Sequence, residues 1–246
     1  MNKYLPETEK VFPKELWIDT LKTDDAINLI LKNQKKAIDA IAKAKKDIHN
    51  VVEKISLILQ NNSGSLIYVG AGSSGRLGVL DGVELPPTFG WSKSRIKFLL
   101  AGGTKAMFES AEKEEDEIRS IASLIKGYNV GEKDIVIGLS ASGSTRFTVK
   151  SIIQANNLGA LTIGIANNKN AQLLKAAKYP IFLDTGPEVI AGSTRMTAGT
   201  AQKICLNVIS TLVMTKLGRV KNGLMIKMKP TNQKLSKRHS FIKSMI

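Results

Sequence analysis

Three polar segments rich in glycine, serine and threonine each follow an apolar run of the sequence. They read Gly-Ala-Gly-Ser-Ser-Gly at 70–75, Ser-Ala-Ser-Gly-Ser-Thr at 140–145 and Gly-Pro-Glu-Val-Ile-Ala-Gly-Ser-Thr-Arg at 186–195. Glycines let the backbone approach a ligand, and hydroxyls and the free N–H groups that open a helix favour an anion. Each segment alone is weak evidence, because a glycine-rich turn also makes a tight strand-to-helix connection. Together they favour binding of a phosphorylated polyol.

Two common nucleotide-binding motifs fit the first of these segments poorly. A Walker loop would need Gly-Lys-Ser or Gly-Lys-Thr at the required spacing, which none of the three segments has. Gly70, Gly72 and Gly75 match the glycine spacing of a dinucleotide fingerprint, but no clear acidic residue ends the next apolar run at 96–100. The sequence therefore favours a sugar phosphate over a nucleotide.

Carboxylates near the first segment supply groups that could transfer protons. Glu84 lies about three helical turns after the glycine–serine segment and directly precedes Leu-Pro-Pro, where two prolines are expected to end the helix. A dense acidic band follows at 109–117, in which Glu112, Glu115 and Asp116 share one helical face. Two carboxylates beside a bound sugar phosphate would allow one to remove a proton and the other to protonate a leaving oxygen, with no metal or organic cofactor.

The elements that must position these residues alternate between strand and helix. Apolar runs at 65–69, 96–100, 134–139, 161–165 and 179–183 read as five strands, with helical patterns between them. Such alternation predicts an α/β fold with a five-stranded parallel sheet, doubly wound and flanked by helices on both faces. In these sheets ligands bind at the carboxyl ends of the strands, where the three polar segments lie.

The regions outside the sheet are predicted to be mostly helical. Residues 1–22 form an irregular arm, Thr23 and the acids after it begin a helix, and residues 35–60 have the spacing of one long amphipathic helix. Residues 196–217 form a broad apolar helix, and 232–246 begin another. We divide the chain into an arm with helices at 1–60, a sugar-phosphate domain at 61–220 and a C-terminal segment at 221–246.

Composition narrows the class of protein. The net charge is +15, but the basic residues that follow Glu188 lack the interleaved aromatic side chains that stack on bases, so we expect no nucleic-acid partner. No apolar run approaches the length of a membrane span or a signal core, and we expect a soluble, cytoplasmic protein without a membrane partner. Cys205 is the only cysteine and His49 and His239 lie far apart, so we expect a buried structural thiol and no metal site.

Four stretches of this sequence resemble the N-acetylmuramic acid 6-phosphate etherases. They run from Tyr68 to Asp81, from Glu84 to Gly90, over Ala-Gly-Gly at 101–103, and from Gly186 to Lys203, and the likeness extends from about Leu21 to about Leu235. The resemblance implies a sugar isomerase (SIS) fold, shared with the glucokinase regulatory protein, and a homodimer without a metal or other cofactor. It also implies a lyase that cleaves the D-lactyl ether of N-acetylmuramic acid 6-phosphate, giving N-acetylglucosamine 6-phosphate and D-lactate by elimination and hydration.

The resemblance also implies roles for individual residues. Glu84 matches the acid that assists lactate departure, and Glu115 matches the second carboxylate, a candidate for the base that removes the C2 proton. The residues expected to hold the phosphate and the sugar hydroxyls come from the three polar segments: Gly72, Ser73, Ser74, Ser140, Ser142, Gly143, Ser144, Thr145, Glu188, Ser193, Thr194 and Arg195.

The sequence departs from the family pattern in three places. Leu85 stands where the family commonly has cysteine, and Ser144 stands where it usually has arginine, which Arg146 replaces only in part. Family members continue beyond the equivalent of Ile246 into a C-terminal helical subdomain, so we expect a shortened member of the family. This leaves a second interpretation beside the active etherase: a regulator that binds a sugar phosphate, or a decayed etherase without turnover.

Overall fold

Five apolar runs of the chain pair side by side into one parallel sheet. The computed structural model describes residues 5–109, 121–230 and 233–245. The strands are β1 (Leu66–Gly70), β2 (Ile96–Leu100), β3 (Ile135–Leu139), β4 (Leu161–Ala166) and β5 (Tyr179–Phe182). Their order across the sheet is β2-β1-β3-β4-β5, and every pairing is parallel. The predicted strands and the fold class are confirmed.

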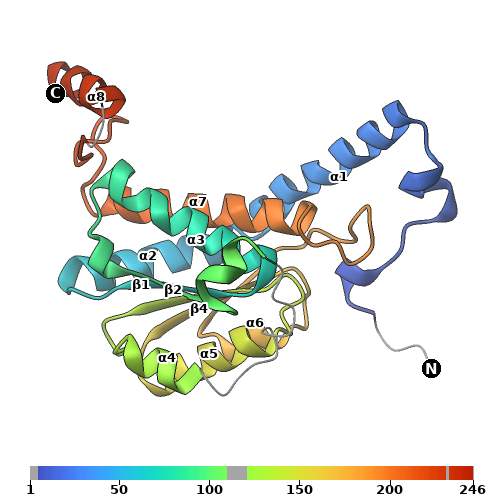
Figure 1. The fold of residues 1–246 in the computed structure, drawn as a ribbon, viewed down its shortest axis with the longest axis horizontal. Helices are drawn as coiled ribbons and strands as arrows, with labels where there is room; N and C mark the ends of the chain where they lie inside the picture. The colour runs from blue at the N-terminus through green and yellow to red at the C-terminus, as the bar shows by residue number, and fades with distance from the viewer. Residues whose placement is uncertain (1–4, 110–120, 231–232, 246) are drawn as a thin grey trace.

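Helices cover both faces of this sheet (Figure 1), and each face has its own hydrophobic core. On one face lie α1 (Thr23–Lys43), α2 (Lys45–Asn61), α3 (Gly72–Phe89) and α7 (Thr197–Lys216). The other face carries α4 (Ile121–Gly127), α5 (Arg146–Asn157) and α6 (Gln172–Ala176). β1 and β3 are buried on both sides, which is why their sequences are continuously apolar rather than alternating.

The N-terminal region shares its core with the sheet. Short 3-10 turns at Glu7–Glu9, Lys14–Leu16 and Ile18–Thr20 lead into α1, which packs on α7, while α2 packs on α7 and β5. The prediction of one helix over 35–60 is wrong, because the chain turns at Ala44, where ψ is 4°, and α1 and α2 are separate helices (Figure 1). Ala44 is itself buried, and the bend lets both helices lay an apolar face on one core. The division of the chain at residues 60 and 220 stays a prediction.

Helix α3 continues through its two prolines, so the prediction that they end the helix is also wrong. The helix runs through Pro86 and Pro87 to Phe89, although both prolines lack the N–H that would bond to the carbonyl four residues earlier. It ends at Gly90, whose φ is +61°. The Gly90 N–H donates to the Pro86 carbonyl at 2.9 Å, which is the hydrogen bond of an αL cap, and the Trp91 N–H donates to the Leu85 carbonyl at 3.4 Å.

The C-terminal part leaves the sheet domain. After α7 the chain forms an isolated bridge between Lys221 and Leu224, and the helix predicted at the end is confirmed as α8 (Gln233–Ser244), which projects from the body (Figure 1). Cys205 lies fully buried in α7, as predicted, and burial raises the pKa of its thiol far above the usual range. In the described ranges no helix has the length and apolar character needed to cross a membrane.

Candidate functional site

The three polar segments follow the carboxyl ends of strands in one sheet: two flank the point where the strand order reverses, and the third follows the edge strand β5. From β1 the chain crosses to β2 on one side, and it then returns to β3 on the other side of β1. The carboxyl ends of β1 and β3 therefore lie next to each other, with Gly70 in register with Leu139. Loops that diverge from such a switch point form the usual ligand crevice of an open parallel sheet.

The loop after β1 is closed tightly by its glycines. A β-carbon on Gly70 would lie 2.7 Å from the Gly75 α-carbon, and one on Gly75 would lie 2.8 Å from the Gly70 carbonyl. The chain turns at Gly72, whose φ is +50°, and α3 begins there. Ser73 is half-buried and Ser74 is buried. The glycines thus bring the start of α3 against the end of β1, where its free N–H groups can meet an anion.

The loop after β3 is organised by its own hydroxyl groups. The buried Ser140 hydroxyl accepts the Gly143 N–H at 3.0 Å and bonds to the Thr145 hydroxyl at 2.9 Å. The Ser142 hydroxyl accepts both the N–H and the hydroxyl of Ser144, at 3.2 and 3.0 Å. Gly143 turns the chain with a φ of +67°. The loop is therefore held in one shape, and Ser144 at its tip is exposed.

The segment after β5 carries the predicted Glu188, which caps helix α7. Glu188 is only 1% exposed, and its carboxylate accepts the N–H of Thr197 at 2.9 Å and of Ala198 at 2.8 Å. A carboxylate at this position satisfies two helix N–H groups and meets the positive end of the helix dipole. Ser193 and Thr194 lie half-buried in the turn before α7, and Arg195 is exposed. Whether these four residues contact a ligand stays a prediction.

Two consecutive asparagines after β4 also lie at this edge, and the sequence analysis did not select them. Asn167 donates to the Leu183 carbonyl and the Thr185 hydroxyl, both at 3.2 Å, and accepts from the Gln202 amide at 3.1 Å. Asn168 donates to the Ala141 carbonyl at 3.1 Å. Both side chains are buried. Their signal in the sequence was a polar Asn-Asn pair directly after an apolar strand, the same signal that marked the three selected segments.

Glu84 lies apart from these loops on the same chain. It is exposed, one turn before the end of α3, and the helix runs back across the sheet from the loop after β1. Residues 72 and 84 are about 18 Å apart along the axis, at a rise of about 1.5 Å per residue. Glu115 lies outside the described residues. The segment that leads toward it is held by Arg76 of α3, whose guanidinium donates to the carbonyls of Ala106 at 2.8 Å and Glu109 at 2.7 Å.

Behind Glu84, a buried carboxylate joins α3 to the sheet and to α7. Asp81 accepts hydrogen bonds from the Tyr68 hydroxyl at 2.9 Å, the Asn207 amide at 2.9 Å and the Ser210 hydroxyl at 3.0 Å. Burial raises the pKa of Asp81, and these hydrogen bonds oppose the increase by stabilising the ionised form. Asp81 thus fixes the orientation of the helix that carries Glu84.

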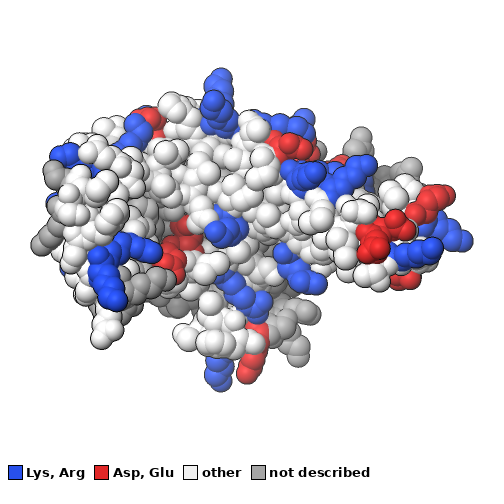
Figure 2. All heavy atoms as spheres, turned by 90° about the horizontal axis from the view of Figure 1, so that it is seen from above, with Lys and Arg blue, Asp and Glu red and all other residues white. Residues whose placement is uncertain are grey.

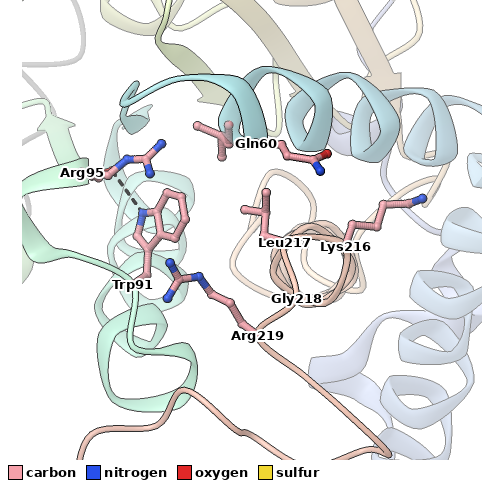
Figure 3. A pocket seen from close by; sticks show the side chains of 8 residues that line it. Gln60, Trp91, Arg95, Lys216, Leu217, Gly218 and Arg219 are labelled. Carbon is pink, nitrogen blue, oxygen red and sulfur yellow. Dashed lines mark hydrogen bonds between the residues drawn. The ribbon is translucent and has the colours of Figure 1, made fainter.

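A cavity of about 370 Å³ opens at the opposite, amino edge of the sheet (Figure 3). Trp91 lies between two guanidinium groups, with the Arg95 carbon 4.1 Å and the Arg219 carbon 4.8 Å from its ring centroid. Both arginines also donate to backbone carbonyls of neighbouring loops. Because its lining includes none of the predicted site residues, we interpret this cluster as a structural clasp between the ends of α2, α3 and α7.

Comparison with known proteins agrees with this geometry. The family described as the SIS domain matches residues 102–212, and the glucokinase regulatory protein N-terminal SIS domain matches residues 30–156. The fold and the loops at its carboxyl edge therefore define an SIS-domain protein.

Closer relatives specify the family. An N-acetylmuramic acid 6-phosphate etherase of Lactobacillus johnsonii is 46% identical over 228 residues, covering 93% of this chain and 76% of the relative. Those of Francisella tularensis subsp. novicida and Clostridium acetobutylicum are 42% and 43% identical, over 94% and 96% of this chain and 78% of each relative. The chain belongs to the N-acetylmuramic acid 6-phosphate etherase family.

Solved structures confirm the fold at lower sequence identity. A Bacteroides fragilis protein described as a phosphosugar isomerase involved in capsule formation superposes with a TM-score of 0.60 at 21% identity, covering 89% of this chain and 97% of that one. A Listeria monocytogenes protein described as a sugar-phosphate isomerase superposes with a TM-score of 0.56 at 17% identity, covering 80% and 93%. At these identities the likeness establishes the SIS fold alone.

Proposed function

We propose that this protein is an N-acetylmuramic acid 6-phosphate etherase, a carbon–oxygen lyase. The observation that carries the proposal is the identity of 42% to 46% with etherases over more than nine tenths of the chain. That match spans all three polar loops at the carboxyl edge and both proposed catalytic carboxylates. The rigid loop Ser140–Thr145 and the start of α3 supply hydroxyl and N–H donors suited to a phosphate monoester.

The reaction takes place on the ring-opened sugar, whose aldehyde makes the C2 proton acidic. A base removes that proton, the bond between C3 and the lactyl ether oxygen breaks, and D-lactate leaves with a proton from an acid. Water then adds across the C2–C3 double bond, so the sum is substrate plus water to N-acetylglucosamine 6-phosphate plus D-lactate. We assign the acid that assists departure to Glu84 and the base that removes the C2 proton to Glu115.

We further propose that the working enzyme is a homodimer in which one copy's Glu84 serves the loops of the other copy. Phosphorus and C3 of a hexose 6-phosphate are five bonds apart, at most about 7 Å when extended. The span of about 18 Å from the start of α3 to Glu84 exceeds that reach. Leu80 and Val83, next to Glu84 on the same helix, are 48% and 47% exposed, which suits contact with a second copy.

The charge distribution on this side of the molecule is compatible with such contact. Figure 2 shows the molecule from the side of α3 and α7. Lysine and arginine side chains are scattered over this view between wide uncharged areas, and they do not form one continuous basic band there. On this face the charges therefore do not form the clustered basic stripe that follows a nucleic-acid backbone.

The test of the activity is release of D-lactate from N-acetylmuramic acid 6-phosphate by the purified protein. We expect wild-type protein to release lactate and Glu84→Gln to be slower by about 100-fold or more, the usual effect of removing a general acid. Saturable binding of the sugar phosphate without lactate release would instead support the regulator interpretation, which the match to the glucokinase regulatory protein domain favours. Equal rates for wild type and Glu84→Gln would remove Glu84 from its assigned role.

The shared site is tested by mixing two inactive variants. Glu84→Gln lacks the acid, and Ser144→Asp places a carboxylate where the phosphate would bind. If the site is shared, refolding the two together should recover about a quarter of wild-type activity, because about half of the dimers are hybrid and each hybrid holds one complete site. Each variant refolded alone is the control. No recovery, with hybrid dimers demonstrated by differently tagged chains, would refute a shared site.

A further inference from the structure

The N-terminal arm lies across the carboxyl edge of the sheet and is anchored there by one buried threonine. Pro6 begins the 3-10 turn Glu7–Glu9, and the turn presents Thr8 toward the protein. Thr8 is 0% exposed, whereas Pro6, Glu9 and Lys10 around it are exposed. A fully buried polar side chain on an otherwise exposed arm indicates a specific contact, because an unpaired hydroxyl would be costly to bury.

All three polar groups of Thr8 bond to two different loops of the site. Its hydroxyl accepts the Asn168 amide at 3.1 Å, and its N–H donates to the Asn168 side-chain oxygen at 3.4 Å. Its carbonyl accepts the N–H of Gly192 at 2.8 Å. Thr8 therefore joins the loop after β4 to the loop before α7, across sequence separations too long for local structure to explain.

Asn168 carries this contact on to the serine loop. The same amide nitrogen that reaches Thr8 donates to the Ala141 carbonyl at 3.1 Å and contacts the Ser142 carbonyl at 3.4 Å. Ser142 is the residue whose hydroxyl accepts both donors of Ser144. One side chain thus lies between the arm and the loop expected to receive the phosphate.

The loop before α7 turns at a glycine where it meets the arm. Gly192 has a φ of +76°, and a β-carbon there would lie 2.8 Å from a carboxylate oxygen of Glu9. This backbone conformation favours glycine, whereas the Glu9 carboxylate is the movable end of an exposed side chain. The arm therefore bonds, through the Gly192 N–H, to the loop that also holds Ser193 and Thr194.

We propose that Thr8 is a positioning residue, which clips the N-terminal arm over the site and holds the Ser140–Thr145 loop in its binding shape through Asn168. This inference rests on the proposed sugar-phosphate function. Because the clip acts on the binding loop and not on Glu84, its loss should weaken substrate binding more than the chemical step. Because it orders an arm, its loss should also free that arm, whatever reaction the protein catalyses.

The experiment compares Thr8→Val, which keeps the β-branched shape but removes the hydroxyl, with Thr8→Ser, which keeps the hydroxyl. Thr20→Val is the matched control, since Thr20 lies on the same arm and its hydroxyl bonds only locally, to the Trp17 carbonyl. The readouts are kcat and KM for lactate release, and the rate of trypsin cleavage after Lys10 and Lys14 followed by mass spectrometry. The cleavage assay is repeated with N-acetylglucosamine 6-phosphate present.

We expect Thr8→Val to raise KM and the trypsin cleavage rate by about five-fold or more, as loss of a buried hydrogen bond allows, with kcat changed by less than about two-fold. Thr8→Ser and Thr20→Val should behave like wild type, and the sugar phosphate should slow cleavage of wild-type protein. If Thr8→Val does not fold, Gly192→Ala strains the backbone whose N–H bonds to the Thr8 carbonyl, with Thr8 itself intact, and should give the same pattern.

Unchanged KM and cleavage rate in a folded Thr8→Val would overturn the proposal. Failure of the proposed function looks different: wild-type protein would release no lactate, while cleavage of the arm would still report whether Thr8 holds it. Faster cleavage of Thr8→Val with no change in KM would leave the arm a structural strap and would also refute a positioning role.

Discussion

Replacing Glu188 by glutamine tests whether this carboxylate caps α7, binds a ligand, or does both. The carboxylate is buried and accepts two N–H groups, at 2.8 and 2.9 Å, from the first turn of α7. Glutamine has the same shape, but it keeps one acceptor oxygen and turns an amide NH₂ toward the other N–H. The variant therefore loses one charge-assisted hydrogen bond and the interaction of a full charge with the helix dipole.

The size of the effect follows from these two losses. A hydrogen bond to a charged group contributes about 1.5–3 kcal/mol, and a partly buried charge at a helix end contributes up to about 2 kcal/mol. Because the two contributions overlap, we expect the free energy of unfolding to fall by about 2–4 kcal/mol. For a chain of this length that corresponds to a decrease in Tm of roughly 10 °C.

The assay is urea unfolding followed by circular dichroism, with thermal unfolding as a second measurement. Glu132→Gln is the control, since it removes the same charge from an exposed turn. Equal unfolding free energies for the two variants would refute the capping argument. If Glu188→Gln unfolds with the same free energy as wild type but binds the sugar phosphate more weakly, Glu188 has the predicted ligand role and its capping of α7 contributes little.

Two further predictions concern the start of α3 and its buried carboxylate. Gly70→Ala should lower the free energy of unfolding by about 1–3 kcal/mol, because its methyl group would lie 2.7 Å from the Gly75 α-carbon. Gly131→Ala is the control: its methyl group would meet nothing within 4 Å, so the free energy of unfolding, measured with urea, should change little. Asp81 has a pKa raised by burial, so its native carboxyl binds a proton more tightly than the unfolded one and stabilises the fold most at low pH. The free energy of unfolding of Asp81→Asn relative to wild type should therefore increase as the pH rises above about 4, the ordinary pKa of aspartate. Urea unfolding of both proteins at several pH values checks this. A difference between the two free energies that stays constant or decreases with pH would contradict it.

The sheet was predictable from sequence because its signals are local. Each strand is a short apolar run, three of them end at or directly before Gly70, Ser140 and Asn167, and the alternation with helical patterns leaves a parallel sheet as the natural arrangement. Once the sheet is parallel, the three polar loops must share an edge. Their meeting at one end of the molecule thus follows from topology, without knowledge of any contact between them.

The parts that were not predictable depend on contacts between distant segments. Pro86 and Pro87 usually end a helix, yet packing of Leu85 and Phe89 in the core and the cap at Gly90 carry α3 one turn further. The contact of Thr8 with Asn168 spans most of the sequence, and neither residue belongs to a recognisable motif. The sequence likewise cannot distinguish a glutamate that caps a helix from one that binds a ligand, because both follow a strand in a polar loop.

The clasp around Trp91 makes one end of the molecule visible to fluorescence. The chain has two tryptophans: Trp91 is 3% exposed and stacked between guanidinium groups, while Trp17 on the arm is 39% exposed. The two indoles therefore emit from environments of different polarity, one on the N-terminal arm and one beside the ends of α2 and α7. With Trp17 replaced by phenylalanine, the remaining emission reports the ends of α2 and α7 alone, and with Trp91 replaced it reports docking of the arm.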